Sequence, residues 1–198
     1  MKFFPKHHSL IFALAVLGES MNGASSFAAG GDKSHVSVAI AKTEDKSVAQ
    51  DQKSEDLVTI LNISGGFSLG SGLIGGLKYF SYSQDSKVLD NVDLEISGFG
   101  PMIGYMHANG LYANFAYLYA PTKEFTADSS EVTYQGGDGY VIDFGKVWDL
   151  SSSLGIGLAM TQSKISYTEA NIAAEKTNLK DEWSDTSLYP YLSIFVFF

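Results

Sequence analysis

Few residues of this 198-residue chain have side chains suited to catalysis, because it contains four His, no Cys and no Arg. Nucleophilic catalysis needs a base beside a nucleophile, yet His107 has no Ser or carboxylate at a supporting spacing. His7 and His8 lie near the N-terminus, and His35 stands apart from them. Without Cys, thiol catalysis, disulfides and thiolate metal sites are excluded. We therefore expect no enzyme and no cofactor or metal.

Four charged residues stand within or beside segments of alternating apolar character: Lys78, Glu95, Glu124 and Asp143. Lys78 and Asp143 each lie about six residues from a short turn, so they would meet if both segments faced one interior. Glu95 and Glu124 would lie further from those turns. We expect Lys78 to pair with Asp143 or Glu95 and to block the interior. The alternative is that each charge is simply hydrated.

The segments that would position these charges alternate with a period of two residues, which is typical of β-strands. Long polar connections, near residues 43–55, 84–92, 126–138 and 168–185, alternate with short turns near 70–72, 107–110 and 149–153. An up-and-down barrel sorts its connections by length in this way, with one kind at each rim. The eight expected strands cover residues 35–42, 56–69, 73–83, 94–106, 111–125, 139–148, 154–167 and 186–198.

The two faces of these strands differ in size. Leu154, Ile156 and Leu158 share one face, whereas the intervening positions hold small residues. A soluble barrel packs its large apolar residues inward, whereas a transmembrane barrel turns them toward lipid. Small residues fill a hydrophobic core poorly, so we place the large face outside. The predicted fold class is all-β, an eight-stranded antiparallel up-and-down transmembrane β-barrel; a soluble periplasmic β-protein is the rival.

The two ends of the chain carry export and assembly patterns. Residues 1–28 combine two Lys, an apolar run and a small-residue stretch, which predicts a signal peptide cut before Ala29 and leaves a barrel over 29–198. The last strand ends in YLSIFVFF, with one face formed by Leu192, Ile194, Val196 and Phe198. This ending resembles the C-terminal signature of Gram-negative outer-membrane β-barrel proteins.

The mature chain as a whole resembles the eight-stranded members of that class, such as the transmembrane domain of outer-membrane protein A and the opacity-type small barrels. The resemblance implies recognition of the last strand by the barrel-assembly machinery, an outer-membrane location and both termini in the periplasm. Amphipathic rings prefer the edge of a bilayer. The expected interfacial aromatics are Tyr79, Tyr117, Tyr119, Tyr140 and Trp148.

Charge limits the partners. A net charge of −9 without a basic cluster argues against nucleic-acid binding. The first and fourth long connections are acidic, so they would either bridge divalent cations to lipopolysaccharide phosphates or simply stay hydrated. We expect a structural, envelope or surface-interaction role in contact with lipid and lipopolysaccharide. A narrow pore or transporter for small solutes is the alternative, and a lipid-modifying enzyme is disfavoured by the position of His107.

Overall fold

The computed structural model describes the whole chain except residues 1–32, 50–51, 87–91, 128–129 and 173–174, so the predicted signal peptide lies outside the described residues. Alternation of large and small residues produces strands almost throughout. Among the described residues, no helix has the length and apolar character needed to cross a membrane. The strands are β1 (His35–Ala49), β2 (Gln52–Gly70), β3 (Leu73–Ser86), β4 (Val92–Met106), β5 (Leu111–Ala127), β6 (Ser130–Gln135), β7 (Asp138–Asp149), β8 (Leu154–Ile172) and β9 (Glu175–Phe197).

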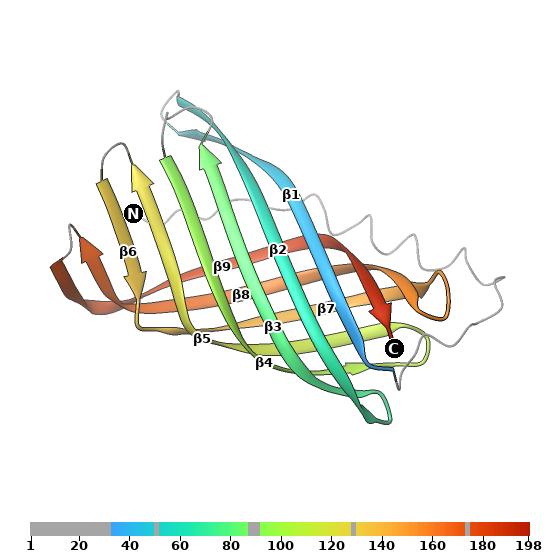
Figure 1. The fold of residues 1–198 in the computed structure, drawn as a ribbon. Helices are drawn as coiled ribbons and strands as arrows, with labels where there is room; N and C mark the ends of the chain where they lie inside the picture. Colours follow the sequence, from blue (N-terminus) through green and yellow to red (C-terminus); the bar gives the residue numbers. More distant parts are fainter. Residues whose placement is uncertain (1–32, 50–51, 87–91, 128–129, 173–174) are drawn as a thin grey trace.

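All neighbouring strands are antiparallel, and they form a closed ring of eight positions (Figure 1). β6 and β7 share one position, because both lie between β5 and β8. The chain bends between them at Gly136, whose φ is +77°, and at Gly137, where a Cβ would meet the carbonyl oxygen of Ser166. β1 pairs with β9 and closes the ring. The predicted eight-stranded antiparallel barrel is therefore confirmed.

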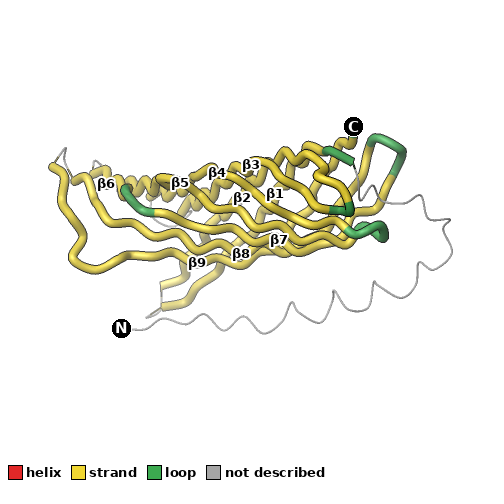
Figure 2. Tube along the Cα trace, turned by 90° about the horizontal axis from the view of Figure 1, so that it is seen from below, coloured by secondary structure: helices red, strands yellow, loops and turns green. Residues whose placement is uncertain are grey.

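Short turns gather at one rim, beside the start of β1 and the end of β9 (Figure 2). The Asn109–Gly110 signal makes such a turn: Gly110 has a φ of +85° and donates its N–H to the carbonyl of His107. At the other rim the structure corrects the predicted loop bounds. Most described residues of 43–55 and 168–185 lie in paired strand, because backbone ladders form between polar segments as readily as between apolar ones.

The closing pair of strands is short. His35–Ile40 pair with Leu192–Phe197. Among the described residues, β1 and β9 have no paired residues further from the short-turn rim than these. Pro190 lies two residues beyond the last pair on β9. Proline lacks an N–H to donate, so it fits a strand whose one side has no partner. The barrel is thus closed by a full ladder only in its short-turn half.

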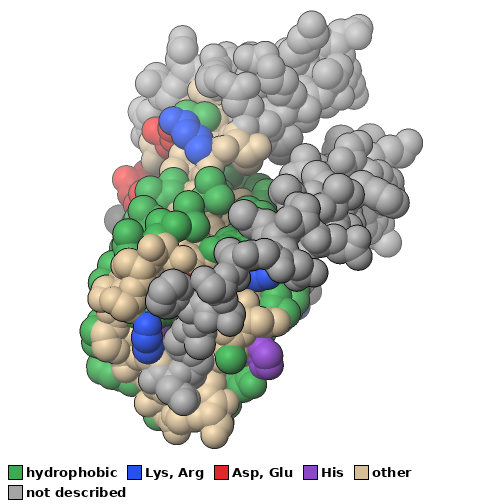
Figure 3. Space-filling view, turned by 90° about the vertical axis from the view of Figure 1, so that its right-hand side faces the viewer, with side chains coloured by type: hydrophobic (Ala, Val, Ile, Leu, Met, Phe, Trp, Pro, Cys, Tyr) green, Lys and Arg blue, Asp and Glu red, His purple; other side chains and the backbone are tan. Residues whose placement is uncertain are grey.

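The outer wall carries exposed apolar residues over the short-turn half, and Figure 3 shows part of this surface as green side chains. On β9, Leu188, Leu192, Ile194, Val196 and Phe198 are apolar and exposed, as are Phe115 on β5 and Phe144 on β7. About ten residues at 3.3 Å each, tilted by about 40°, span about 25 Å, the height of a hydrocarbon band. Large side chains therefore point away from the bore, as predicted.

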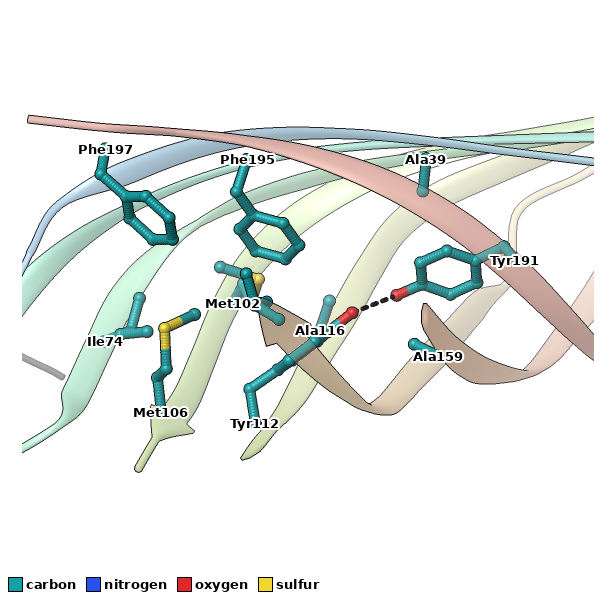
Figure 4. Packing of buried hydrophobic residues seen from close by; sticks show 11 residues of the cluster. Ala39, Ile74, Met102, Met106, Tyr112, Ala116, Ala159, Tyr191, Phe195 and Phe197 are labelled. Carbon is teal, nitrogen blue, oxygen red and sulfur yellow. Dashed lines mark hydrogen bonds between the residues drawn. The ribbon is translucent and has the colours of Figure 1, made fainter. Parts of the chain in front are cut away.

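The bore is filled by two groups of side chains. The rim cluster comprises Ala39, Ile74, Met102, Met106, Tyr112, Ala116, Val147, Ala159, Tyr191, Phe195 and Phe197 (Figure 4). The loop-side cluster comprises Val58, Ile60, Phe80, Tyr82, Ile96, Leu118, Val141, Ile165 and Tyr167. Both clusters contain large apolar side chains, so the expectation that small residues occupy the inward positions was wrong at both ends of the bore, including the loop-side half. That half rises above the outer apolar band, so it needs its own core.

Candidate functional site

Lys78 on β3 and Asp143 on β7 meet inside the barrel. Nζ of Lys78 lies 2.6 Å from Oδ2 of Asp143, and the two residues are 2% and 1% exposed. Lys78 follows Ile74 of the rim cluster and precedes Phe80 of the loop-side cluster on the same inward face. Together with buried Asn62, Asn114 and Thr161, the pair forms what we call the polar belt.

Both charged side chains lie between the two packed clusters and are almost fully shielded from solvent. A buried ion pair is held by mutual attraction and by further hydrogen bonding, since desolvation opposes it. Lys78 and Asp143 come from strands on different walls of the barrel, so the pair also joins those walls. The structure thus brings together two of the four charged candidates.

The rim cluster closes the bore below the belt. The hydroxyls of Tyr112 and Tyr191 are hydrogen-bonded across it at 3.3 Å (Figure 4). Phe195 stacks on Phe197, with ring centroids 5.9 Å apart, and His35 lies 5.3 Å from Phe195. Aromatic rings thus occupy the bore between the belt and the short-turn rim.

Glu95 and Glu124 do not face the bore, and here the prediction was wrong. Both side chains are exposed, on residues paired across β4 and β5. On β4 the even-numbered residues from Ile96 to Met106 are all buried, so unbroken alternation places Glu95 outside. β5 instead carries a bulge: the register shifts opposite Ser97–Phe99, and Ala120 adopts a φ of +42°. One extra residue reverses inward and outward parity, which turns Glu124 out.

The same bulge turns Lys123 inward, a residue that sequence reasoning missed. Its Nζ lies 3.0 and 2.9 Å from the two carboxylate oxygens of Asp185. The ammonium also lies 5.7 Å from the ring centroid of Tyr134 and 5.6 Å from that of Trp183. Burial and the nearby Asp185 charge raise the pKa of Tyr167, so its hydroxyl stays neutral. Pro121 was the local sign of the bulge, because proline inside a sheet is confined to edge positions and bulges.

The predicted interfacial aromatics all lie on the outer face. Tyr79, Tyr117, Tyr119 and Trp148 are exposed, and Tyr140 is half-buried. Tyr117 and Tyr119 lie where the apolar band ends, and the Tyr117 hydroxyl donates to Asp138 at 2.7 Å. Trp148 lies near the short-turn rim. Interfacial girdles consist of outward aromatic residues of this kind, and the location of these five at a membrane interface stays a prediction.

The residues of the predicted C-terminal assembly signal share the outer face of β9 and its end. Leu192, Ile194, Val196 and Phe198 are between 48% and 69% exposed. The N–H of Phe198 donates to the carbonyl of Ser34, so pairing with the first strand extends to the last residue. Recognition of this strand by an assembly machinery stays a prediction.

The histidines form no catalytic group with the residues described. His35 is buried between Phe195 and Phe197, whereas His107 occupies the β4–β5 turn, where its Nδ1 accepts from the N–H of Asn109. Gly66–Gly70 matches the G-x-S-x-G spacing, which the sequence reasoning missed. It ends an antiparallel strand instead of entering a helix, so the nucleophile-elbow geometry is absent there.

Among the residues whose side chains are described, no three His, Asp or Glu come together as metal ligands. The acidic side chains of the first long connection all lie outside the described residues. In the fourth, Glu169 pairs with Lys176 at 2.8 Å. A divalent-cation role for these segments therefore stays a prediction.

An eight-position closed ring, an apolar outer band and a filled bore are now established for this chain. The fold is that of a small transmembrane β-barrel. No family model and no curated protein sequence matches it. The ring of eight strand positions agrees with the strand number of the barrels that the sequence resembles.

Three solved structures are similar to the chain. Neisserial surface protein A has a TM-score of 0.49 at 12% identity, covering 85% of this chain and 97% of its own. The β domain of the Bordetella autotransporter BrkA has a TM-score of 0.43 at 12% identity, with 83% and 70% covered. OmpT, an outer-membrane protein of Vibrio cholerae, has a TM-score of 0.30 at 10% identity, with 82% and 51% covered. At such identities, no residue role can be transferred.

Proposed function

We propose that this protein is a non-enzymatic integral barrel of a Gram-negative outer membrane, with a structural or surface-interaction role. The outer band supports insertion, because about 25 Å of apolar wall would be unfavourable in water and matches hydrocarbon thickness. In lipid every backbone group needs an internal partner, and a closed ladder provides it. Outer-membrane lipid and lipopolysaccharide are the partners that this surface fits.

We place both chain ends and the short turns in the periplasm, and the long hairpins outside the cell. The described chain begins and ends at the short-turn rim, which agrees with the usual arrangement of short periplasmic turns and longer external connections. The exposed, alternating face of β9 and its terminal Phe198 fit a segment that the barrel-assembly machinery would recognise.

The observation that carries the structural role is the filled bore. The buried Lys78–Asp143 pair lies between the rim cluster and the loop-side cluster. Barrels of about eight strands enclose an interior that side chains fill. The alternative, a narrow pore, needs a continuous passage, and these clusters oppose one.

The first experiment is membrane fractionation with gel migration before and after boiling. A detergent-requiring protein whose mobility changes on boiling supports the barrel in a membrane; release as a soluble protein contradicts it.

Single-channel recording in planar bilayers then separates the two roles. We expect no steady conductance from the wild type, and discrete, sustained openings would favour the pore. The same recording is made on Lys78→Met, which removes the buried cation from the bore. Lys164→Met is the matched control, because it makes the same substitution on the exposed outer face.

Recognition of the last strand has its own test. Replacing Phe198 with Ser removes an exposed ring without opening a cavity, so the free energy of unfolding in vitro should change by less than about 1 kcal/mol. In cells, the amount of assembled barrel should fall at least severalfold. Equal assembly of both forms would contradict the proposal.

A further inference from the structure

A cavity of about 160 Å³ lies in the loop-side half of the bore, between the walls formed by β3–β4 and β8–β9. Its apolar lining comes from Phe80, Leu94, Ile96 and Ile165, together with the rings of Tyr82 and Tyr189, which lie 6.0 Å apart. Its polar lining comes from Gln84, Ser163, Asp185, Thr186 and Ser187. The cavity therefore has an apolar body, and most of its polar lining comes from β8 and β9.

The volume indicates the size of a suitable ligand. An engineered apolar cavity of about 150 Å³ in another protein accommodates benzene. A space of similar size bounded by rings and branched aliphatic side chains fits a single six-membered aromatic ring with a small substituent. A longer acyl chain or a disaccharide would not fit.

The charges that line the cavity indicate whether a ligand should be charged or neutral. Asp185 is already held by Lys123 through both carboxylate oxygens, so the pair is neutral as a unit. A charged ligand would either displace Lys123 from Asp185, Tyr134 and Trp183 or lie in a largely apolar pocket without an opposite charge to pair with. A neutral hydroxyl can instead hydrogen-bond to the carboxylate or to the serine hydroxyls at little cost.

The position of the cavity indicates the side from which the ligand enters. At this level the outer face is polar on three strands: Ser83, Glu95 and Lys164 stand outward beside the cavity-lining Tyr82, Ile96 and Ile165. On β9, exposed Leu188 between the lining Ser187 and Tyr189 marks the end of the apolar band. The cavity therefore lies at and above the loop-side edge of the hydrocarbon band. A water-soluble molecule reaches it more directly than a membrane lipid does.

We propose that this cavity is a binding site for a small neutral aromatic alcohol. The ring lies against Phe80, Ile96 and Ile165, and the hydroxyl faces Asp185 and the Ser163–Ser187 pair. This inference goes beyond the structural role above and does not depend on it, because the site lies within the loop-side core, whichever membrane surrounds the barrel.

The test is equilibrium dialysis of the detergent-solubilised mature protein against benzyl alcohol, with protein-free micelles as the blank. Benzoate and benzylammonium at pH 7 have the same ring with a negative or positive charge. We expect saturable binding of one benzyl alcohol per chain and at least tenfold weaker binding of both charged probes. Uptake equal to that of the micelle blank, or tightest binding of a charged probe, would overturn the proposal.

Two variants fill the cavity from opposite walls: Ser187→Phe and Ile96→Phe. Each should weaken benzyl alcohol binding at least tenfold in protein that still changes mobility on boiling, which shows that the barrel is folded. Gln162→Phe is the matched control, because this exposed residue adds the same ring to the outer face beside Ser163. It should bind within twofold of wild type. Unchanged binding by either folded cavity-filling variant would place the ligand elsewhere.

Discussion

Removing the charge of Lys78 tests the structural account most directly. In Lys78→Met the aliphatic stem remains, but Asp143, 1% exposed, loses its ion-pair partner. Breaking a buried pair by removing one partner costs about 3–5 kcal/mol, because the remaining charge stays desolvated. We therefore expect the free energy of unfolding to fall by that amount.

Replacing both partners should restore much of the loss. In Lys78→Met/Asp143→Asn no charge remains in the polar belt, and the amide keeps the shape of the carboxylate. Neutral replacements of buried ion pairs are often tolerated, so the double variant should be at least about 2 kcal/mol more stable than Lys78→Met. Lys164→Met, on the exposed outer face, should change stability by no more than about 0.5 kcal/mol.

Urea-induced unfolding of the barrel in lipid vesicles, followed by intrinsic fluorescence, measures these differences as shifts in midpoint at constant slope. A loss of less than about 1 kcal/mol in Lys78→Met would refute the reasoning. It would mean that water reaches Asp143, and therefore that the bore is hydrated at the belt. Conductance through the same variant would then be expected.

Three further outcomes are expected. Ile194→Lys places a charge in the apolar band and should cost about 2–4 kcal/mol in vesicle unfolding, whereas Thr186→Lys, exposed above the band, should cost at most about 1 kcal/mol. Gly76→Ala should lower the urea midpoint because its Cβ would meet the carbonyl of Gly65; Gly65→Ala, with nothing closer than 4.0 Å, should leave it within error. N-terminal sequencing of the exported protein should begin at Ala29, and a retained N-terminus would contradict the predicted signal peptide.

Strand periodicity and connection length predicted the barrel because both are local properties of the chain. Side chains alternate across a strand, so the exposed positions of Phe115 and Ile194 followed once the large face was placed outside. The same parity argument placed Lys78 and Asp143 inside, since neither strand has a bulge between its short turn and the charged residue.

The alternation of inward and outward side chains gave wrong directions for residues beyond the bulge on β5. At Ala120 a single extra residue turned Glu124 outward and Lys123 inward, and nothing in the spacing of the flanking residues fixed that position. The sequence also failed to predict the loop-side core. The long polar connections were interpreted as loops, but their backbones continue the strand ladder. The extended strands enclose Phe80, Ile165 and the neighbouring cavity.

The sequence by itself determined the number of ring positions, the outward direction of the large residues and the rim at which the chain begins and ends, because each follows from alternation and turn length along the chain. Only the tertiary structure decided which charges meet, where the bulge falls and that an aromatic cavity forms above the polar belt. Those features depend on which residues face one another across the bore, and that register is set by all strands together.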